Sequence, residues 1–176
     1  SFLDRNAASP DWHLQLETFD PHEPFHAPQE YRDRFVTGYN GPVLDWPRYR
    51  RTDGDSEAEM AEMRANYAAL VALCDDQLGR LLDWMDDTGA WDDTALIVTT
   101  DHGFLLGEHD WWGKNRAPFY NEIANIPLVV CLPGVAAGRS DALSQNIDIA
   151  ATLLDLHGLP RPPAMVGRSL VPCATD

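Results

Sequence analysis

The sequence is short of long apolar runs, cysteines and basic residues. No apolar run approaches the roughly 20 residues that a membrane helix needs, and the start, SFLDRNAASPDW, has neither the basic nor the apolar segment of a signal peptide. The start also lacks an initiator Met, so we expect the natural N-terminus to lie upstream, which leaves secretion open. The cysteines Cys74, Cys131 and Cys173 form no C-x-x-C pair and are typical of free thiols, which favours a cytoplasmic location.

Basic residues are scarce: 13 Lys and Arg stand against 28 Asp and Glu, for a net charge of −15. Nucleic-acid binding rests on clustered Lys and Arg, so this balance argues against a nucleic-acid partner. A small anionic substrate needs only local cations, and the candidates are Lys114, Arg116, His22 and His26. With 44% hydrophobic and 23% charged residues the 176-residue chain is otherwise an ordinary globular sequence, not a disordered or collagen-like one.

Hydrophobic periodicity divides the chain into strands and helices. A capping box from Ser56 to Glu59 opens a long amphipathic helix that ends near Gly89. Strand-like runs cover residues 12–19, 95–100 and 127–132, and helical spacing covers residues 56–89, 119–125 and 145–158. This order predicts an α/β layered fold with a largely parallel sheet. Asp148 in the last helix is predicted to be a cap or a buried polar anchor.

The run Ala95–Thr100 ends abruptly in Asp101-His102-Gly103. Open α/β sheets bind ligands at the carboxyl ends of their strands, so this is a candidate site. A carboxylate and a neutral imidazole could hold two positions on a divalent cation. The alternative is an Asp that caps the next helix beside a His that merely packs. The presence of Lys114 favours the metal-site interpretation over the helix-cap alternative, because an anionic substrate needs a compact cation near the metal-binding residues.

A second candidate is His22, between the prolines of DPHEP. The segment follows the predicted strand at 12–19, so His22 would also stand in a rigid loop at a strand end, where it could donate a hydrogen bond to an anion or a proton to a leaving group. The alternative is a surface histidine. Residues 27–55 show little periodicity, which predicts a long ordered loop at the rim of the site. This loop either shapes substrate selection or packs on the surface. Its aromatic and cationic residues are Tyr31, Tyr39, Trp46, Tyr49, Arg50 and Arg51.

A series of motifs resembles the sulfatase family of the alkaline-phosphatase-like superfamily. They occur in that family's order: PHEPF, LGRLLDWMDDTGAWDDT, TTDHG, LGEH with its Lys, IPLVVCLPG, NIDIAATLLDLHG and GRSL. The resemblance spans nearly the whole chain. It implies an alkaline-phosphatase-like three-layer sandwich with a largely parallel or mixed central sheet.

The resemblance also implies roles for particular residues. In sulfatases the residues matching Asp101 and His102 ligate a divalent metal, usually calcium, with manganese or magnesium as alternatives here. The residue matching Lys114 contacts the sulfate, and the one matching His22 lies beside the sulfate opposite the metal. These two would also assist the leaving alcohol. No ligand role can be assigned to His109 in LGEH, which is expected either to support the ligands from behind or to be structural.

The family's nucleophile is absent from this chain. Sulfatases use a formylglycine made from Cys or Ser in a C-x-P/A-x-R motif, and no Cys or Ser here stands in that pattern. The paired aspartates of the family's first strand and its smaller C-terminal sheet domain are also missing. We therefore expect residues 1–176 to be part of a single catalytic domain, with a rim loop at 27–55 and an irregular tail at 159–176. Two ligands rarely hold a hard cation tightly, so we expect weak metal binding and negligible turnover from these residues alone.

The resemblance predicts a sulfuric ester hydrolase that acts on a small anionic sulfate ester, with its formylglycine outside this chain. An alternative is a phosphate or phosphonate ester hydrolase of the same superfamily, because phosphoryl and sulfuryl groups need similar cations. Another is a catalytically inactive α/β fragment or binding module, which the missing nucleophile supports. The sulfated alcohol and the oligomeric state stay open.

Overall fold

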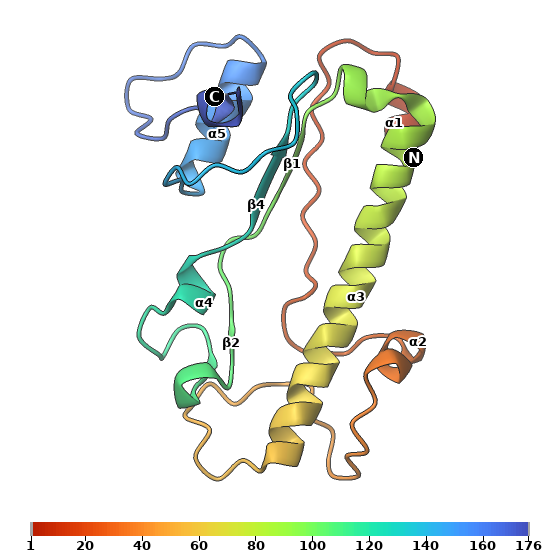
Figure 1. Ribbon diagram of the computed structural model, residues 1–176, viewed down its shortest axis with the longest axis vertical. Coiled ribbons are helices and arrows are strands. Elements are labelled where there is room, and N and C mark those ends of the chain that lie inside the picture. Colours follow the sequence, from red (N-terminus) through yellow and green to blue (C-terminus); the bar gives the residue numbers. More distant parts are fainter. Residues whose placement is uncertain (1, 176) are drawn as a thin grey trace. The chain divides into compact units, whose positions relative to one another are not determined.

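A computed structural model describes residues 2–175, and the chain forms two compact units (Figure 1). The first unit joins Ser1–Glu17 to Gly134–Asp176, and the second is the continuous segment Thr18–Pro133. All four residues predicted to form the site belong to the second unit. None of the described helices is long and apolar enough to cross a membrane.

The second unit is built on one long helix, α3 (Glu57–Thr88, 32 residues). Its first turn is closed by the predicted capping box, which the structure confirms: the Glu59 backbone N–H donates to the Ser56 hydroxyl, and the Ser56 backbone N–H donates to the Glu59 carboxylate. Gly89 ends the helix in a left-handed conformation, with φ of 69°. The periodicity of the sequence thus located both ends of α3.

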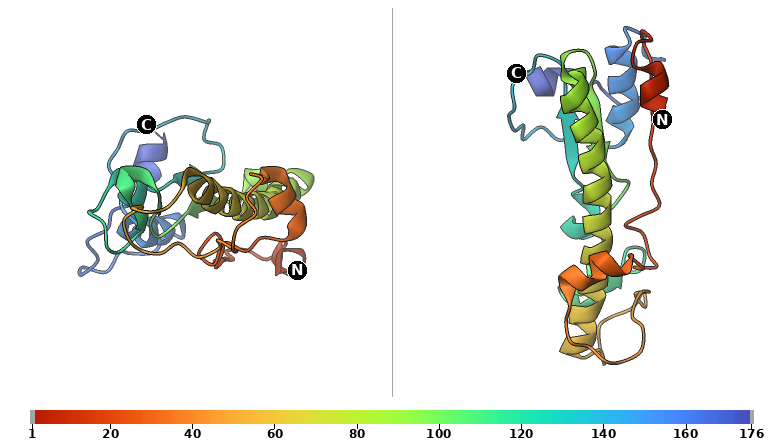
Figure 2. Two further views of the ribbon diagram at one scale, coloured as in Figure 1. Left: turned by 90° about the horizontal axis from the view of Figure 1, so that it is seen from below. Right: turned by 90° about the vertical axis from the view of Figure 1, so that its right-hand side faces the viewer.

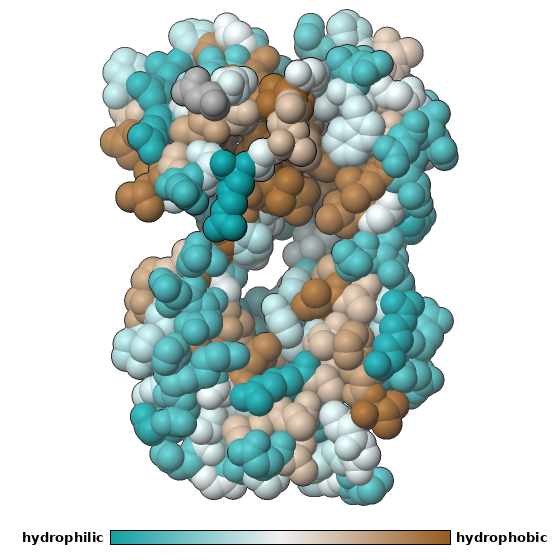
Figure 3. All heavy atoms as spheres, viewed as in Figure 1, coloured by the Kyte–Doolittle hydropathy of each residue, from teal (hydrophilic) through white to brown (hydrophobic). Residues whose placement is uncertain are grey.

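The core of the second unit lies along α3. The short helix α2 (Gln29–Arg32) contacts α3 and lies beside it in Figure 1 and in the two views of Figure 2. The space-filling view shows mostly hydrophilic side chains, with a few hydrophobic ones among them, where α3 and α2 border the view (Figure 3). The buried cluster is formed by the segment before α2, by α2 and α3, and by β3. It consists of Phe25, Ala27, Tyr31, Met63, Ala69, Leu70 and Trp112.

The strands form two antiparallel pairs. β1 (Leu96–Thr99) pairs with β4 (Leu128–Cys131), with Thr99 opposite Leu128, and β2 (Leu105–Leu106) pairs with β3 (Trp112–Gly113). The predicted strands at 95–100 and 127–132 are confirmed, but the expectation of a largely parallel sheet is wrong for this pair. The connection from β1 leaves and returns at the same end of the pair, so β4 must run in the opposite direction.

The predicted strand at 12–19 is wrong. These residues are irregular, and Leu16 and Phe19 are 69% and 67% exposed. Their alternating pattern is that of a strand, but no strand among residues 2–175 pairs with them, and an extended segment needs a partner strand to form a β-ladder.

The rim loop (residues 27–55) contains α2 and a short 3-10 helix, Asp33–Phe35, and is otherwise irregular as predicted. Two further 3-10 turns are Ala90–Asp92 and Glu108–Asp110.

The remaining helices confirm two predictions. In the second unit, α4 (Asn121–Ala124) falls within the helix predicted at 119–125. In the first unit, α5 (Ile147–Leu156) falls within 145–158, and the flanking helices are α1 (Phe2–Asn6) and α6 (Val171–Thr175). Asp148 is a buried polar anchor, as predicted. Its carboxylate accepts hydrogen bonds from the backbone N–H groups of Arg168 and Gln145, at 2.8 and 2.9 Å.

Candidate functional site

His22 lies in a loop between two prolines, and the Asp20–Pro21 and Glu23–Pro24 peptide bonds are both cis. The imidazole Nδ1 is 2.7 Å from the Glu23 carbonyl oxygen, which can only accept, so we assign the ring proton to Nδ1. The Phe19 ring lies against the imidazole, with 4.7 Å between centroids. The loop therefore fixes both the orientation and the tautomer of His22, and leaves Nε2 as an acceptor.

Lys114 is the only lysine of the sequence and directly follows β3. Its Nζ lies 2.7 Å from His22 Nε2, and its side chain is 14% exposed. An ammonium group has donors only, so it must donate to the Nε2 lone pair of a neutral imidazole. The two predicted catalytic residues are thus in direct contact, with one proton between them.

Glu23 is a site residue that sequence reasoning missed. Its side chain is 3% exposed, and Oε2 lies 3.5 Å from Lys114 Nζ and 3.4 Å from His22 Nδ1. The other oxygen, Oε1, accepts a hydrogen bond from the Tyr49 hydroxyl. Glutamate is almost never fully buried unless it is paired, so nothing in the sequence marked it as interior. The only available signal was its position next to His22.

Tyr49 reaches this carboxylate because the rim loop is held against β3. The Trp112 backbone N–H donates to the Arg50 carbonyl at 2.9 Å, and Arg51 forms an antiparallel bridge with Trp111. Gly113 has φ of 102°, and a Cβ there would lie 2.8 Å from the Tyr49 ring, so only glycine suits this position. Tyr31, another aromatic residue of the rim loop, is buried in the core. This position favours a packing role for Tyr31 over a role in substrate selection.

Asp101 and His102 follow β1, as predicted. Asp101 Oδ2 lies 3.5 Å from His102 Nε2, and their side chains are 80% and 38% exposed. Partial desolvation opposes ionisation of Asp101, but the hydrogen bond from the His102 backbone N–H and the nearby imidazole outweigh it and lower the pKa of Asp101. No helix begins here, since β2 follows, so the helix-capping alternative is wrong.

The donor set of Asp101 and His102 fits two positions on a divalent cation. The His102 Nδ1 lies 2.9 Å from the Gly103 carbonyl and donates to it, which leaves the Nε2 lone pair beside the Asp101 carboxylate. Metal-binding histidines commonly donate their other N–H in this way. Within residues 2–175, however, no group of three His, Cys, Asp or Glu side chains could hold a metal. The described residues supply at most part of a metal site.

Gly103 holds this turn against α4. Its backbone N–H donates to the Ile123 carbonyl at 2.8 Å, and a Cβ at this position would lie 1.8 Å from the Glu122 carbonyl oxygen. Any side chain would therefore displace either the turn or α4. The Phe104 ring that follows lies 5.7 Å from Lys114 Nζ. The packing of this one segment thus connects the Asp101–His102 pair to the Lys114–His22 pair.

The other candidate cations do not join this arrangement. His26 is 66% exposed and lies 4.0 Å from Asp45. Arg116 is exposed and forms no ion pair with the described residues. The His109 ring stacks on Tyr120, with 3.8 Å between centroids, and its Nε2 lies 3.1 Å from a Glu122 oxygen.

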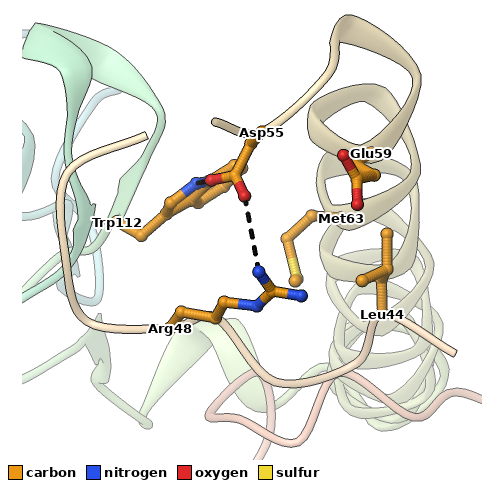
Figure 4. Close-up of a pocket in the computed structure, with 6 residues that line it drawn as sticks. All are labelled: Leu44, Arg48, Asp55, Glu59, Met63 and Trp112. Atoms are coloured by element: carbon orange, nitrogen blue, oxygen red, sulfur yellow. Dashed lines mark hydrogen bonds and ion pairs between the residues drawn. The ribbon is translucent and has the colours of Figure 1, made fainter. Parts of the chain in front are cut away.

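A small hollow lies elsewhere in the second unit, between α3, the rim loop and β3 (Figure 4). Figure 4 shows the guanidinium of Arg48 pointing toward the Asp55 carboxylate, and their closest atoms are 3.8 Å apart. The hollow has a volume of about 20 Å³, enough for roughly one water molecule. Its lining includes none of the predicted site residues, so it is not the site of the chemistry.

Comparison with known proteins identifies the family. The profile of the family described as Sulfatase matches residues 1–159, which is most of the chain. The chain belongs to the sulfatase family. A curated sulfatase relative, the N-acetylglucosamine-6-O-sulfatase of Bacteroides thetaiotaomicron, is 33% identical over 151 residues, which are 82% of this chain. The same match covers 26% of that relative, so the chain spans about a quarter of its length.

Solved structures agree with the sulfatase assignment. One, determined in complex with its substrate D-glucosamine-2-N,6-O-disulfate, is 34% identical with a TM-score of 0.62, over 70% of this chain and 26% of that one. The phosphonate monoester hydrolase of Agrobacterium radiobacter is 28% identical with a TM-score of 0.71, over 89% and 36% of the two chains. Sulfatases generally use a divalent metal and a formylglycine. No three His, Cys, Asp or Glu side chains among residues 2–175 could hold a metal, and no Cys or Ser of the sequence lies in a C-x-P/A-x-R motif.

Proposed function

We propose that the full-length protein is a sulfuric ester hydrolase and that residues 1–176 carry part of its site within a single catalytic domain. The observation that carries this proposal is the 2.7 Å contact between Lys114 Nζ and His22 Nε2. It joins the two residues to which the family resemblance gives sulfate-binding and leaving-group roles. The complete domain would be the three-layer sandwich of the alkaline-phosphatase-like fold, to which the two strand pairs contribute.

The roles follow from the chemistry of each side chain. Lys114 binds a sulfate oxygen, because an ammonium is a compact cation with donors to spare. When the bond between sulfur and the leaving oxygen breaks, the departing alcohol needs a proton, and the proton between Lys114 and His22 is available for it. His22 and Lys114 therefore act on the leaving-group side of the ester.

Asp101 and His102 would hold the divalent cation, with calcium as the first candidate and manganese or magnesium as alternatives. When bound, the metal and the formylglycine supply charge compensation for the sulfate oxygens and the nucleophilic oxygen. The remaining metal ligands and the formylglycine would come from outside residues 1–176. Because His102 would supply a nitrogen ligand, manganese is a better candidate here than at a site with oxygen ligands alone.

The test uses the full-length gene product, expressed with a formylglycine-generating enzyme. The rates of hydrolysis of an aryl sulfate and of a 6-O-sulfated glucosamine are measured for the wild-type protein and for its Lys114→Met variant. We expect sulfate release by the wild type and a loss of about 10²- to 10³-fold in the variant. Equal rates in the two proteins, or no sulfate release by a protein with verified formylglycine, would exclude the sulfatase proposal.

A second candidate is hydrolysis of phosphonate or phosphate monoesters. The likeness to the Agrobacterium radiobacter phosphonate monoester hydrolase favours it, because that structure covers 89% of this chain. Comparing kcat/KM for an aryl sulfate and a matched aryl phosphonate ester decides between the two reactions. Turnover of either ester would also exclude the third alternative, a catalytically inactive fragment or binding module.

A further inference from the structure

We propose that Glu23 is a positioning residue, whose buried carboxylate, anchored by Tyr49, holds Lys114 as an ammonium against neutral His22. The claim that Glu23 pairs with Lys114 stands on geometry alone. Its consequence for turnover rests on the proposed hydrolase function. Glu23 itself is not expected to touch the substrate.

The Glu23 carboxylate is buried. Only 3% of the Glu23 side chain is exposed, and Oε2 accepts no hydrogen bond from the described residues. An ionised carboxylate removed from water needs an opposite charge nearby. The ion-pair partners within 4.0 Å of Glu23 in the described part of the chain are Lys114, at 3.5 Å, and His22, at 3.4 Å.

Lys114, not His22, carries the positive charge of this contact. The His22 proton is on Nδ1, where it meets the Glu23 carbonyl, and Nε2 accepts from Lys114. The imidazole is then neutral, so the ammonium is the charge that compensates Glu23. A second proton on His22 would place two cations 2.7 Å apart. Glu23 and Lys114 therefore form a pair of zero net charge beside a neutral His22.

Glu23 also limits the directions in which the Lys114 ammonium can donate. The ammonium has three N–H donors, one directed at His22 Nε2 and one on the side of Glu23 Oε2, which leaves the third for an anionic oxygen. Glu23 cannot swing away from Lys114, because Tyr49 donates to its other oxygen and the Tyr49 ring is packed against Gly113. The carboxylate thus fixes where the third donor points.

The experiment compares Glu23→Gln with the wild type in the full-length enzyme. The amide keeps the shape of the side chain and removes its charge. We expect kcat/KM to fall by about 10- to 100-fold, as for other groups that orient a functional side chain. The alkaline limb of the pH profile should also move to lower pH, because Glu23 no longer favours the protonated form of the Lys114–His22 pair. Among the described residues, the charged group beside this pair is Glu23, and Tyr49 contacts the pair only through Glu23.

Two further variants separate positioning from a general loss of structure. Tyr49→Phe removes the hydrogen bond to Oε1 and should shift the pH profile in the same direction by less. Tyr67→Phe, on α3, and Glu57→Gln, exposed in the first turn of α3, make the same chemical changes outside the rim loop and the site. We expect both controls to keep the wild-type profile. A Glu23→Gln enzyme with an unmoved profile and kcat/KM within twofold of wild type would overturn the proposal.

A thermal unfolding cycle tests the pairing without any turnover. Lys114→Met should lower Tm by several degrees, because it leaves Glu23 buried and unpaired. Adding Glu23→Gln to Lys114→Met should recover most of that loss. If the two Tm changes simply add, Glu23 does not pair with Lys114 and the proposal is wrong. If the changes are coupled but no ester is hydrolysed, the pairing stands and it is the hydrolase function that fails.

Discussion

Lys114 Nζ and His22 Nε2 lie 2.7 Å apart, although 92 positions of sequence separate the two residues. His22 belongs to a proline-bounded loop and Lys114 follows β3, so neither residue is held by the element that holds the other. The rim loop is hydrogen-bonded to β3 and presents Tyr49 to Glu23, whose carboxylate lies beside both residues. Under the proposed hydrolase function, variants at this contact should lower turnover.

Replacing His22 by Gln should lower kcat/KM of the full-length enzyme by about 10²- to 10⁴-fold, because the amide cannot accept and release a proton. The measurement is aryl sulfate hydrolysis at neutral pH. His26→Gln is the matched control, since His26 is 66% exposed and lies away from Lys114. A larger loss for His26 than for His22 would contradict the arrangement described here.

Removing the metal should abolish turnover, and Asp101→Asn should raise the Kd for calcium by more than about 10-fold, since one anionic ligand is lost. Titration calorimetry of the full-length protein after treatment with EDTA measures this affinity. Asp83→Asn, exposed on α3, is the control for a change in net charge. Unchanged calcium affinity in Asp101→Asn would remove Asp101 from the metal site.

Two glycine substitutions should change stability in opposite directions. Gly103→Ala places a Cβ 1.8 Å from the Glu122 carbonyl oxygen, and it should lower the free energy of unfolding by about 1–3 kcal/mol. Gly79→Ala lies within α3 and meets nothing within 4 Å, so it should raise that free energy by about 0.5–1 kcal/mol through helix propensity. Urea unfolding of both variants measures the difference. Equal effects would show that α4 does not confine Gly103.

Asp148 should make stability depend on pH. The hydrogen bond from the Arg168 backbone N–H, assisted by that from Gln145, lowers the pKa of Asp148 despite its desolvation. A carboxyl group whose pKa is lower in the folded state stabilises the fold above its unfolded pKa of about 3.9, and that stability is lost as the pH falls through the folded pKa.

Asp148→Asn should therefore lower the free energy of unfolding by about 1.5–3 kcal/mol at pH 7, the range for hydrogen bonds to a charged group. The difference from wild type should shrink as the pH falls below about 4. Denaturant unfolding at several pH values measures it. A difference that stays constant with pH would mean that the charge of Asp148 does not contribute.

The sequence by itself determined the elements whose signals are local. The Ser56 capping box and Gly89 fixed both ends of α3, and the apolar runs fixed β1 and β4, because periodicity and caps act within a few residues. The motif order also determined the family and pointed to His22, Asp101, His102 and Lys114. These predictions needed no knowledge of what packs against what.

Only the tertiary structure decided what depends on distant neighbours. The segment at 12–19 alternates like a strand but has no described partner, and the direction of β4 relative to β1 followed from where the connection returns. The burial of Glu23 depends on Lys114 and Tyr49, which are distant from it in the sequence and lie beside its carboxylate. Strand pairing and charge burial are set by contacts between segments far apart in the chain, so no local pattern could have predicted them.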